Sequence, residues 1–253
     1  RQDKFPHGLD ADPKITGEGY VDKEFDFMPS RASIQKEVEE MQGMDPDQAW
    51  LRWVDWAVEA LVNKLKEKGV YDNTLIIVTS DHGATRFGKT TIYETGIRVP
   101  LMMHWPNGIE PGQVYQELVQ NIDYAPTFLD LAGVKLHDKM DMDGVSIKSV
   151  LQGNDKPVHD HLFFELGFAR GIMTKDWKYI AVRYPEDVQM QIAQGKKFKS
   201  FLGEDMDVPY LTRNGHLGHH ASRQNPHYFE ADQLYNLKVD SEETDNVFMM
   251  NPE

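Results

Sequence analysis

One stretch of the chain, residues 74–100, constrains the fold more than any other. Near its start stand four apolar residues, 75–78, a run long enough to form a buried strand. The run ends just before Asp81, His82 and Gly83. Open α/β sheets place their ligands beyond the carboxyl ends of their strands, so we expect a site at this point. Gly83 lets the chain turn sharply after the two candidate ligands.

The loop that follows this strand adds positive charge to the predicted site. The carboxylate of Asp81 suits a hard metal ion, and Lys89 suits a negatively charged ester. From spacing alone, a simpler interpretation is also open: Asp81 caps the loop and His82 is hydrogen-bonded within the sheet. Arg86, in the same loop, is either a substrate contact or an exposed side chain.

Six segments of the chain match the motifs of a known family, in the same order. The first combines SDHG at residues 80–83 with GKTTIYETGIRVP at residues 88–100. The others are WPNG at 105–108, NIDYAPTFLDLAG at 121–133, DGVS at 143–146, DWKYI at 176–180, and QLYNL at 233–237 with Asp240, Glu243 and Asn246. These segments resemble the sulfatase family of the alkaline-phosphatase superfamily, from about residue 46 to the end.

The resemblance implies an α/β fold with a sulfatase-like mixed sheet flanked by helices and a small C-terminal antiparallel-sheet subdomain. We expect residues 1–155 to form the C-terminal part of the α/β core and residues 156–253 to form the small subdomain. The implied activity is that of a sulfatase, a sulfuric ester hydrolase acting on a sulfate monoester. The implied substrate is a sulfated carbohydrate, such as a sulfated polysaccharide, or an aryl sulfate.

The resemblance also implies roles for individual residues. Asp81 and His82 are implied to hold a divalent ion, with Ca²⁺ favoured over Mn²⁺ or Zn²⁺. The imidazole is a less usual ligand for a hard cation and is the reason to keep the two transition metals open. Lys89 is implied to be catalytic and to contact the sulfate. Glu94 and Arg98 are expected to form an ion pair or a backbone clamp that fixes this lysine.

The nucleophile of the family is absent from this chain. In sulfatases it is a formylglycine made from Cys or Ser in a C/S-x-P-x-R motif. The chain has no Cys, and its one similar string, FMPSR at residues 27–31, begins with Phe27, which has no atom that can become an aldehyde. The resemblance therefore implies the C-terminal half of a sulfatase, inactive alone, with the N-terminal half of the same enzyme as its partner.

Two other functions stay open at this point. One is a phosphate or phosphonate monoester hydrolase of the same superfamily, which the DHG tripeptide also fits. The other is a non-catalytic fragment that binds sulfated glycans. The resemblance implies a periplasmic or secreted protein, although no signal peptide is visible in the sequence.

The charge and hydropathy of the chain exclude some partners. A formal net charge of −14 over 253 residues argues against a nucleic-acid-binding surface and against adhesion to anionic membranes. No apolar run reaches transmembrane length. We therefore expect neither nucleic acid nor a membrane as a partner. A local cluster of Lys196, Lys197 and Lys199 is either a solvated face or a positive patch for a sulfated polymer.

The remaining patterns predict a few more elements. An apolar stripe at helical spacing predicts a helix over residues 46–68, and residues 122–132 predict another. Short β-rich runs predict strands over 114–119, 162–165, 169–174 and 177–184. Residues 185–225 show little pattern, and Gly218 is expected to prevent a helix there. His216 and His219 in this segment are candidate substrate contacts, and a solvated loop explains them equally well.

Overall fold

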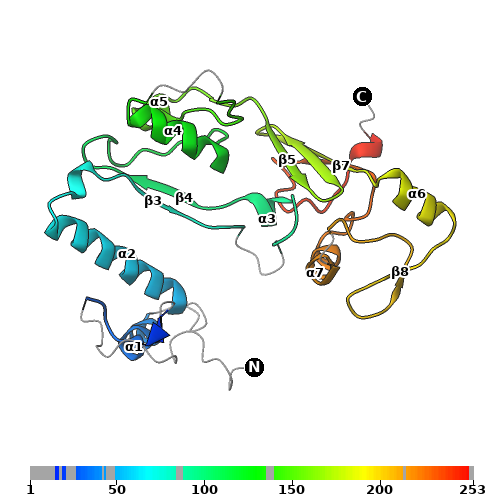
Figure 1. The fold of residues 1–253 in the computed structure, drawn as a ribbon, viewed down its shortest axis with the longest axis horizontal. Coiled ribbons are helices and arrows are strands. Elements are labelled where there is room, and N and C mark those ends of the chain that lie inside the picture. Colours follow the sequence, from blue (N-terminus) through cyan, green and yellow to red (C-terminus); the bar gives the residue numbers. More distant parts are fainter. Residues whose placement is uncertain are drawn as a thin grey trace. The chain divides into compact units, whose positions relative to one another are not determined.

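The computed structural model describes residues 15–16, 19–20, 27–41, 43, 49–83, 88–134, 140–212 and 215–250. Two compact units form (Figure 1): Arg1–Thr74 with Trp105–Asn107, and Leu75–His104 with Gly108–Glu253. The boundary predicted between residues 155 and 156 stays a prediction. Over the described ranges, no helix combines the length and apolar character that crossing a membrane requires.

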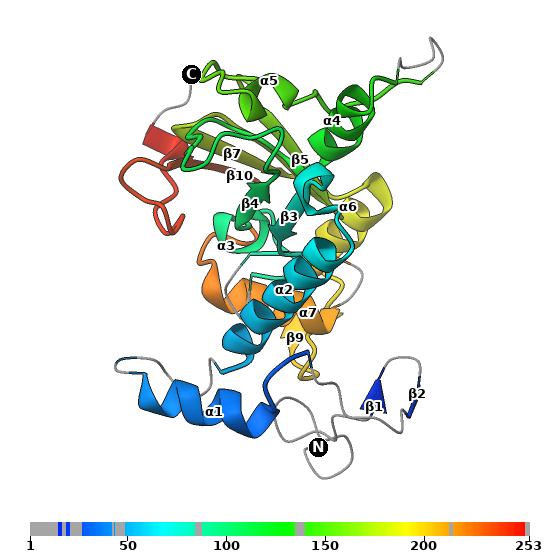
Figure 2. The same cartoon turned by 90° about the vertical axis from the view of Figure 1, so that its left-hand side faces the viewer.

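The first unit is mainly helical (Figures 1 and 2). It contains β1 (Ile15–Thr16), β2 (Gly19–Tyr20), α1 (Arg31–Glu40), α2 (Ala49–Glu67) and the short helix η3 (Tyr71–Asn73). The side chain of Ser30 accepts the backbone N–H of Ser33 and so caps α1. Glu37 of α1 accepts hydrogen bonds from Arg52 and Trp56 of α2, at 2.8 and 3.0 Å. The long helix predicted over residues 46–68 is confirmed as α2.

The second unit begins with the predicted site strand. β3 (Ile76–Thr79) pairs antiparallel with β4 (Leu101–His104), and Ile76 lies opposite His104. The strand is confirmed, but Ile76 and Ile77 are half-buried rather than buried. Among the described residues, β3 pairs with β4 alone, and a two-stranded ribbon has few neighbouring side chains to cover either of its faces.

The segment after β4 is built from short helices and loops. Its helices are η4 (Asn121–Asp123), α4 (Tyr124–Leu131) and α5 (Lys148–Leu151). A further short helix, α3 (Glu94–Ile97), lies just before β4. The prediction of a strand over residues 114–119 is wrong, since no strand forms there. Side chains hold this segment instead of a backbone ladder: the Tyr115 hydroxyl donates to the Lys156 carbonyl at 2.9 Å, and Glu117 pairs with Lys175 at 2.6 Å.

A buried carboxylate organises the turn that leads into α4. Asp123 is fully buried and accepts the backbone N–H groups of Gln120 and Val145, each at 2.9 Å. The Nε2 atom of His159 lies 2.9 and 3.0 Å from the two carboxylate oxygens. The carbonyl of Asp123 also accepts the Thr127 hydroxyl at 2.6 Å. One side chain thus joins η4 to the chain before α5 and to the chain before β5.

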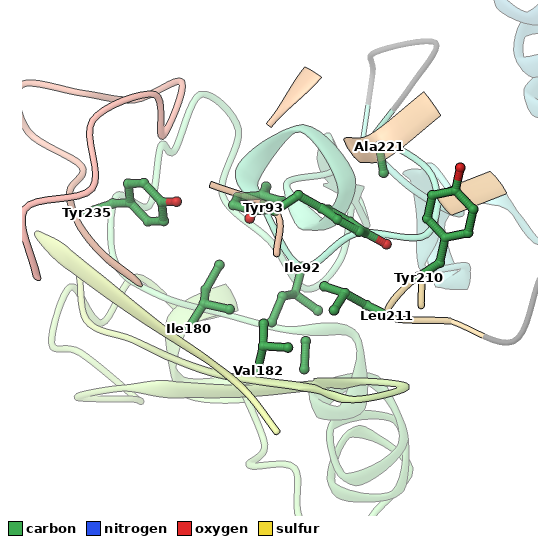
Figure 3. Packing of buried hydrophobic residues seen from close by; sticks show 10 residues of the cluster. Ile92, Tyr93, Ile180, Val182, Tyr210, Leu211, Ala221 and Tyr235 are labelled. Carbon is green, nitrogen blue, oxygen red and sulfur yellow. The ribbon is translucent and has the colours of Figure 1, made fainter. Parts of the chain in front are cut away.

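The predicted antiparallel sheet is confirmed and has four strands in the order β10-β7-β6-β5. These are β5 (Leu162–Leu166), β6 (Ala169–Met173), β7 (Trp177–Val182) and β10 (Asp232–Asn236). Its inner face forms the core of the second unit. Ile180 and Val182 of β7 face Ile92 and Tyr93, which come from the segment just after the site loop (Figure 3). The core therefore fixes the C-terminal end of the site loop against the sheet.

Residues 185–225 are more regular than their sequence indicates. They form α6 (Glu186–Ala193), a hairpin of β8 (Phe198–Lys199) and β9 (Asp205–Met206), and α7 (Gly215–Gln224); the short helix η5 (Phe248–Met250) follows β10. The expectation that Gly218 prevents a helix is wrong. Gly218 is buried within α7, where a Cβ would lie 2.9 Å from atoms of Tyr210. The glycine is thus needed for close packing of the helix.

The lysine cluster of this region is neutralised by its neighbours. Lys197 pairs with Asp207, and Lys199 pairs with Asp205 at 2.5 Å. Lys196 donates to Gln191 at 2.5 Å. Since carboxylates lie beside two of the three ammonium groups, the hairpin favours the interpretation of a solvated face.

An ion pair at one end of the sheet gives a pH prediction. The pKa of Asp232 lies below its ordinary value, because the Tyr179 hydroxyl and the Arg183 guanidinium stabilise its carboxylate. Such a group adds stability above its unfolded pKa, about 3.9, and loses it as pH falls through the lower folded value. We expect Asp232→Asn to make the unfolding free energy less sensitive to pH below about 4. Thermal melts over a pH series test this, and equal pH slopes for both proteins would contradict it.

Candidate functional site

Three residues predicted from the sequence converge after β3. The Lys89 ammonium lies 3.9 Å from Asp81 Oδ2, and His82 Nε2 lies 3.8 Å from Asp81 Oδ1. The side chain of Asp81 is 77% exposed, and that of Lys89 is 56% exposed. Neither distance is a close contact, so the carboxylate keeps room to bind a further group. The arrangement therefore offers two metal-binding donors beside one cation on an open surface.

The local backbone fixes which nitrogen of His82 faces Asp81. His82 Nδ1 lies 2.9 Å from the carbonyl oxygen of Gly83. A carbonyl can only accept, so Nδ1 carries the proton in this contact and Nε2 keeps its lone pair in the neutral ring. Metal-binding histidines are commonly oriented in this way by a backbone carbonyl. The imidazole is therefore in a form that can bind a metal ion.

The donors fit part of a metal site. Asp81 offers carboxylate oxygens and His82 offers Nε2, and these are donors that Ca²⁺, Mn²⁺ or Zn²⁺ use to different degrees. Within the part of the chain that the structure describes, no cluster of three or more His, Asp or Glu side chains is placed to hold a metal. The two residues fit a divalent ion only as a partial ligand set.

The loop that carries Lys89 is closed tightly on itself. The Gly83 N–H donates to the Gly96 carbonyl at 2.8 Å, and the Thr91 hydroxyl donates to the Gly88 carbonyl at 2.8 Å. A Cβ on Gly83 would lie 2.2 Å from the Thr95 carbonyl oxygen. The two ends of the loop therefore touch through backbone atoms, with no space for side chains between them.

A substitution at Gly96 tests this close packing. A Cβ there would lie 2.3 Å from the Gly88 carbonyl oxygen and 2.4 Å from the Thr91 hydroxyl. We expect Gly96→Ala to lower the unfolding free energy by about 1–3 kcal/mol, as overpacking does. Urea denaturation measures the change. In Gly195→Ala the added Cβ meets no atom within 4 Å, so this variant shows the cost of a side chain at a positive φ without any overlap. An equal loss in both variants would contradict the packing argument.

The C-terminal end of the loop is bound to the four-stranded sheet. The Tyr93 hydroxyl donates to the Gln233 side chain at 2.7 Å, and Lys178 Nζ lies 2.6 Å from Glu94 Oε1. The Glu94 carboxylate thus pairs with Lys178 and not with Arg98, so the predicted ion pair is wrong. A backbone contact between the two residues is present, because the Arg98 N–H donates to the Glu94 carbonyl at 3.0 Å. Lys178 was not identified from the sequence as a residue near the site. The DWKYI match and the β-rich run at residues 177–184 pointed to this strand, but neither indicated its contact with Glu94.

The other predicted site residues lie in parts of the chain whose side chains the structure does not describe. Arg86 lies outside the described residues. His216 and His219 fall within α7, but their side chains lie outside the described part as well. The proposed contacts of these three residues with a substrate stay predictions.

Comparison with known proteins identifies relatives of the chain. Residues 9–134 match the family model described as Sulfatase, and residues 81–192 match the one described as N-sulphoglucosamine sulphohydrolase, C-terminal. The ulvan-active sulfatase of Formosa agariphila is 32% identical over 186 residues, covering 66% of this chain and 36% of that relative. Human N-acetylglucosamine-6-sulfatase is 43% identical over 106 residues, covering 40% of this chain and 19% of that relative. The chain therefore spans only about a third or less of the length of these two relatives.

Solved structures show the same fold. One, from work on glycosaminoglycan metabolism by Bacteroides thetaiotaomicron, has a TM-score of 0.57 at 22% identity and covers 79% of this chain and 40% of its own. Another, described as a complex with its substrate D-glucosamine-2-N,6-O-disulfate, has a TM-score of 0.51 at 24% identity and covers 86% and 40%. The predicted α/β fold class is confirmed by this likeness.

Proposed function

We propose that this chain, which belongs to the sulfatase family, forms part of an enzyme that hydrolyses sulfate monoesters. The observation that carries the proposal is the meeting of Asp81, His82 and Lys89 at the end of β3. These residues lie inside the segments that match both family models. The relatives found are named sulfatases, which favours a sulfate ester over a phosphate or phosphonate ester.

The roles of the three residues follow from their chemistry. Asp81 and His82 would hold a divalent ion, Ca²⁺ in the first place, which when bound would polarise the ester and stabilise the nucleophile. Lys89 donates N–H groups to the sulfate oxygens and stabilises the charge that develops on them during transfer. A formylglycine nucleophile would come from the N-terminal half of the same enzyme.

Incomplete burial of the β3–β4 ribbon supports this partner. A two-stranded ribbon is marginally stable by itself. Ile76, Ile77 and Val78 are successive residues and so point to both faces of the ribbon, yet none is fully buried. Further strands and helices would bury these side chains and complete the metal site. We therefore place the N-terminal half of the enzyme against this ribbon.

The substrate class is inferred from the relatives. One is named for activity on ulvan, and another for the 6-sulfate of N-acetylglucosamine. We propose a sulfated carbohydrate as the substrate of the intact protein, with aryl sulfates as convenient test compounds. A periplasmic or secreted location remains part of the proposal.

Parallel assays on the intact protein test the proposal. Turnover of an aryl sulfate and the matching aryl phosphate is measured together with metal content by mass spectrometry. We expect faster sulfate hydrolysis, one tightly held divalent ion and a formylglycine in the intact mass. The 253-residue chain alone should be inactive and bind metal weakly. Faster phosphate hydrolysis would overturn the sulfatase assignment, and sulfated-glycan binding without hydrolysis would support a binding fragment instead.

A further inference from the structure

We propose that a buried charged triad of Lys178, Glu94 and Glu243 positions the Lys89 loop, so that the C-terminal sheet takes part in catalysis through this contact. The three residues come from β7, from the start of α3 and from the turn after β10. The inference rests on the proposed function for its kinetic readout. Its structural readout is independent of that function.

The triad is buried in a way that makes its charges interdependent. The side chains of Lys178 and Glu243 are 0% exposed, and that of Glu94 is 13% exposed. Lys178 Nζ lies 2.6 Å from Glu94 Oε1 and 2.7 Å from Glu243 Oε1. A buried ammonium group needs nearby anions, and removal of one partner leaves the other charges uncompensated. Lys178 is thus the central link between two carboxylates from distant parts of the chain.

The second carboxylate also contacts the backbone of the loop. Glu243 Oε2 accepts the backbone N–H of Glu94, so Glu243 binds both the first residue of α3 and its ion-pair partner. Glu243 has a φ of 55°, a conformation that non-glycine residues adopt infrequently. Asp240 stabilises the turn by accepting the N–H groups of Thr244 and Asp245 at 3.0 and 2.9 Å. The turn therefore presents Glu243 to the loop at the cost of local backbone strain.

The contact is close enough to Lys89 to act on it. Glu94 is five residues after Lys89 in the sequence. Tyr93, next to Glu94, is buried and donates to Gln233 of β10. Gly96, in the first turn after Glu94, accepts the N–H of Gly83 beside the two candidate metal ligands. A shift of α3 would therefore be transmitted to both ends of the site loop.

A double-mutant cycle in the intact protein tests the proposal. The variants are Lys178→Met, Glu94→Gln and the two combined, with Arg183→Met as a control. Arg183 directly follows β7, has a side chain that is 55% exposed, and pairs with Asp232 rather than with either carboxylate of the triad. Because displacement of a catalytic group by about 1 Å can cost about 100-fold in rate, we expect each triad variant to lower kcat by about 10- to 30-fold.

The expected results separate positioning from simple stabilisation. The KM for an aryl sulfate should change by less than about threefold, and the double variant should be no slower than Lys178→Met, because the link is already broken. Amide hydrogen exchange of residues 88–98 should become faster by about 10-fold or more, while β5 and β6 exchange as in the unchanged protein. The control should match the unchanged protein in both measurements.

Other results would overturn the proposal. These are an unchanged kcat in folded triad variants, multiplicative effects in the double variant, or an equal rise of exchange throughout the sheet. If the unchanged protein does not hydrolyse sulfate esters, the proposed function fails, and hydrogen exchange alone then decides whether the triad holds the loop. If Lys178→Met does not fold, Glu94→Gln supplies both measurements, because it keeps the shape of the side chain and one acceptor oxygen and removes only the charge.

Discussion

Replacement of Lys89 by alanine is expected to lower turnover of the intact protein by about 100- to 1,000-fold, as the loss of one charge-stabilising donor does. The thermal melt should change little. The side chain is 56% exposed, and its ion-pair partner among the described residues, Asp81, lies 3.9 Å away with 77% of its side chain exposed. An exposed pair of this kind contributes little to stability. The large kinetic effect and the small structural effect together identify a residue that acts on the transition state.

A matched lysine provides the control for this experiment. Lys197 has a side chain that is 55% exposed and pairs with Asp207 on the β8–β9 hairpin. Lys197→Ala should therefore leave both turnover and melting temperature near those of the unchanged protein. Turnover that survives Lys89→Ala in a normally folded protein would exclude this residue from the mechanism. Lys89→Arg adds information, because a guanidinium keeps the charge but changes the donor geometry.

Local patterns in the sequence predicted the elements that are marked by runs of apolar or β-branched residues. The run at residues 75–78 gave β3, and the β-rich runs after residue 160 gave three strands of the sheet. The pattern failed where a single packing contact between side chain and backbone decides the structure. Gly218 lies inside α7 because the Tyr210 ring occupies the space that a side chain would need. Nothing in the local sequence indicates which ring will pack against that glycine.

The candidate site shows the same division. Asp81, His82 and Lys89 are close in the sequence, and the family motifs pointed to them directly. The predicted ion-pair partner of Glu94 was wrong, because Lys178 lies 84 residues further along the chain and the sheet brings it to Glu94. An isolated lysine in a strand carries no local sign that it will be buried. Its burial depends on two carboxylates, one of which follows the last strand of the sheet.

Asp123→Ala is expected to lower the unfolding free energy by about 3–5 kcal/mol, the range seen when one partner of a buried charged contact is removed. The carboxylate is fully buried and accepts two backbone N–H groups, those of Gln120 and Val145. His159, with only 10% of its side chain exposed, would lose its acceptor at the same time. Each buried donor left without a partner costs about 1–3 kcal/mol, so several such losses add to a large effect.

Denaturation in urea measures the loss, and a second aspartate of the same segment controls for it. Asp130 lies in α4 and accepts the Ser146 hydroxyl at 2.7 Å and Lys148 at 3.0 Å, but its side chain is 46% exposed. Asp130→Ala should therefore cost much less, because water replaces the lost contacts. Asp123→Asn keeps one carbonyl oxygen and should fall between the two alanine variants. A similar midpoint for Asp123→Ala and Asp130→Ala would contradict the view that burial of the Asp123 network, rather than its hydrogen bonds alone, stabilises this part of the second unit.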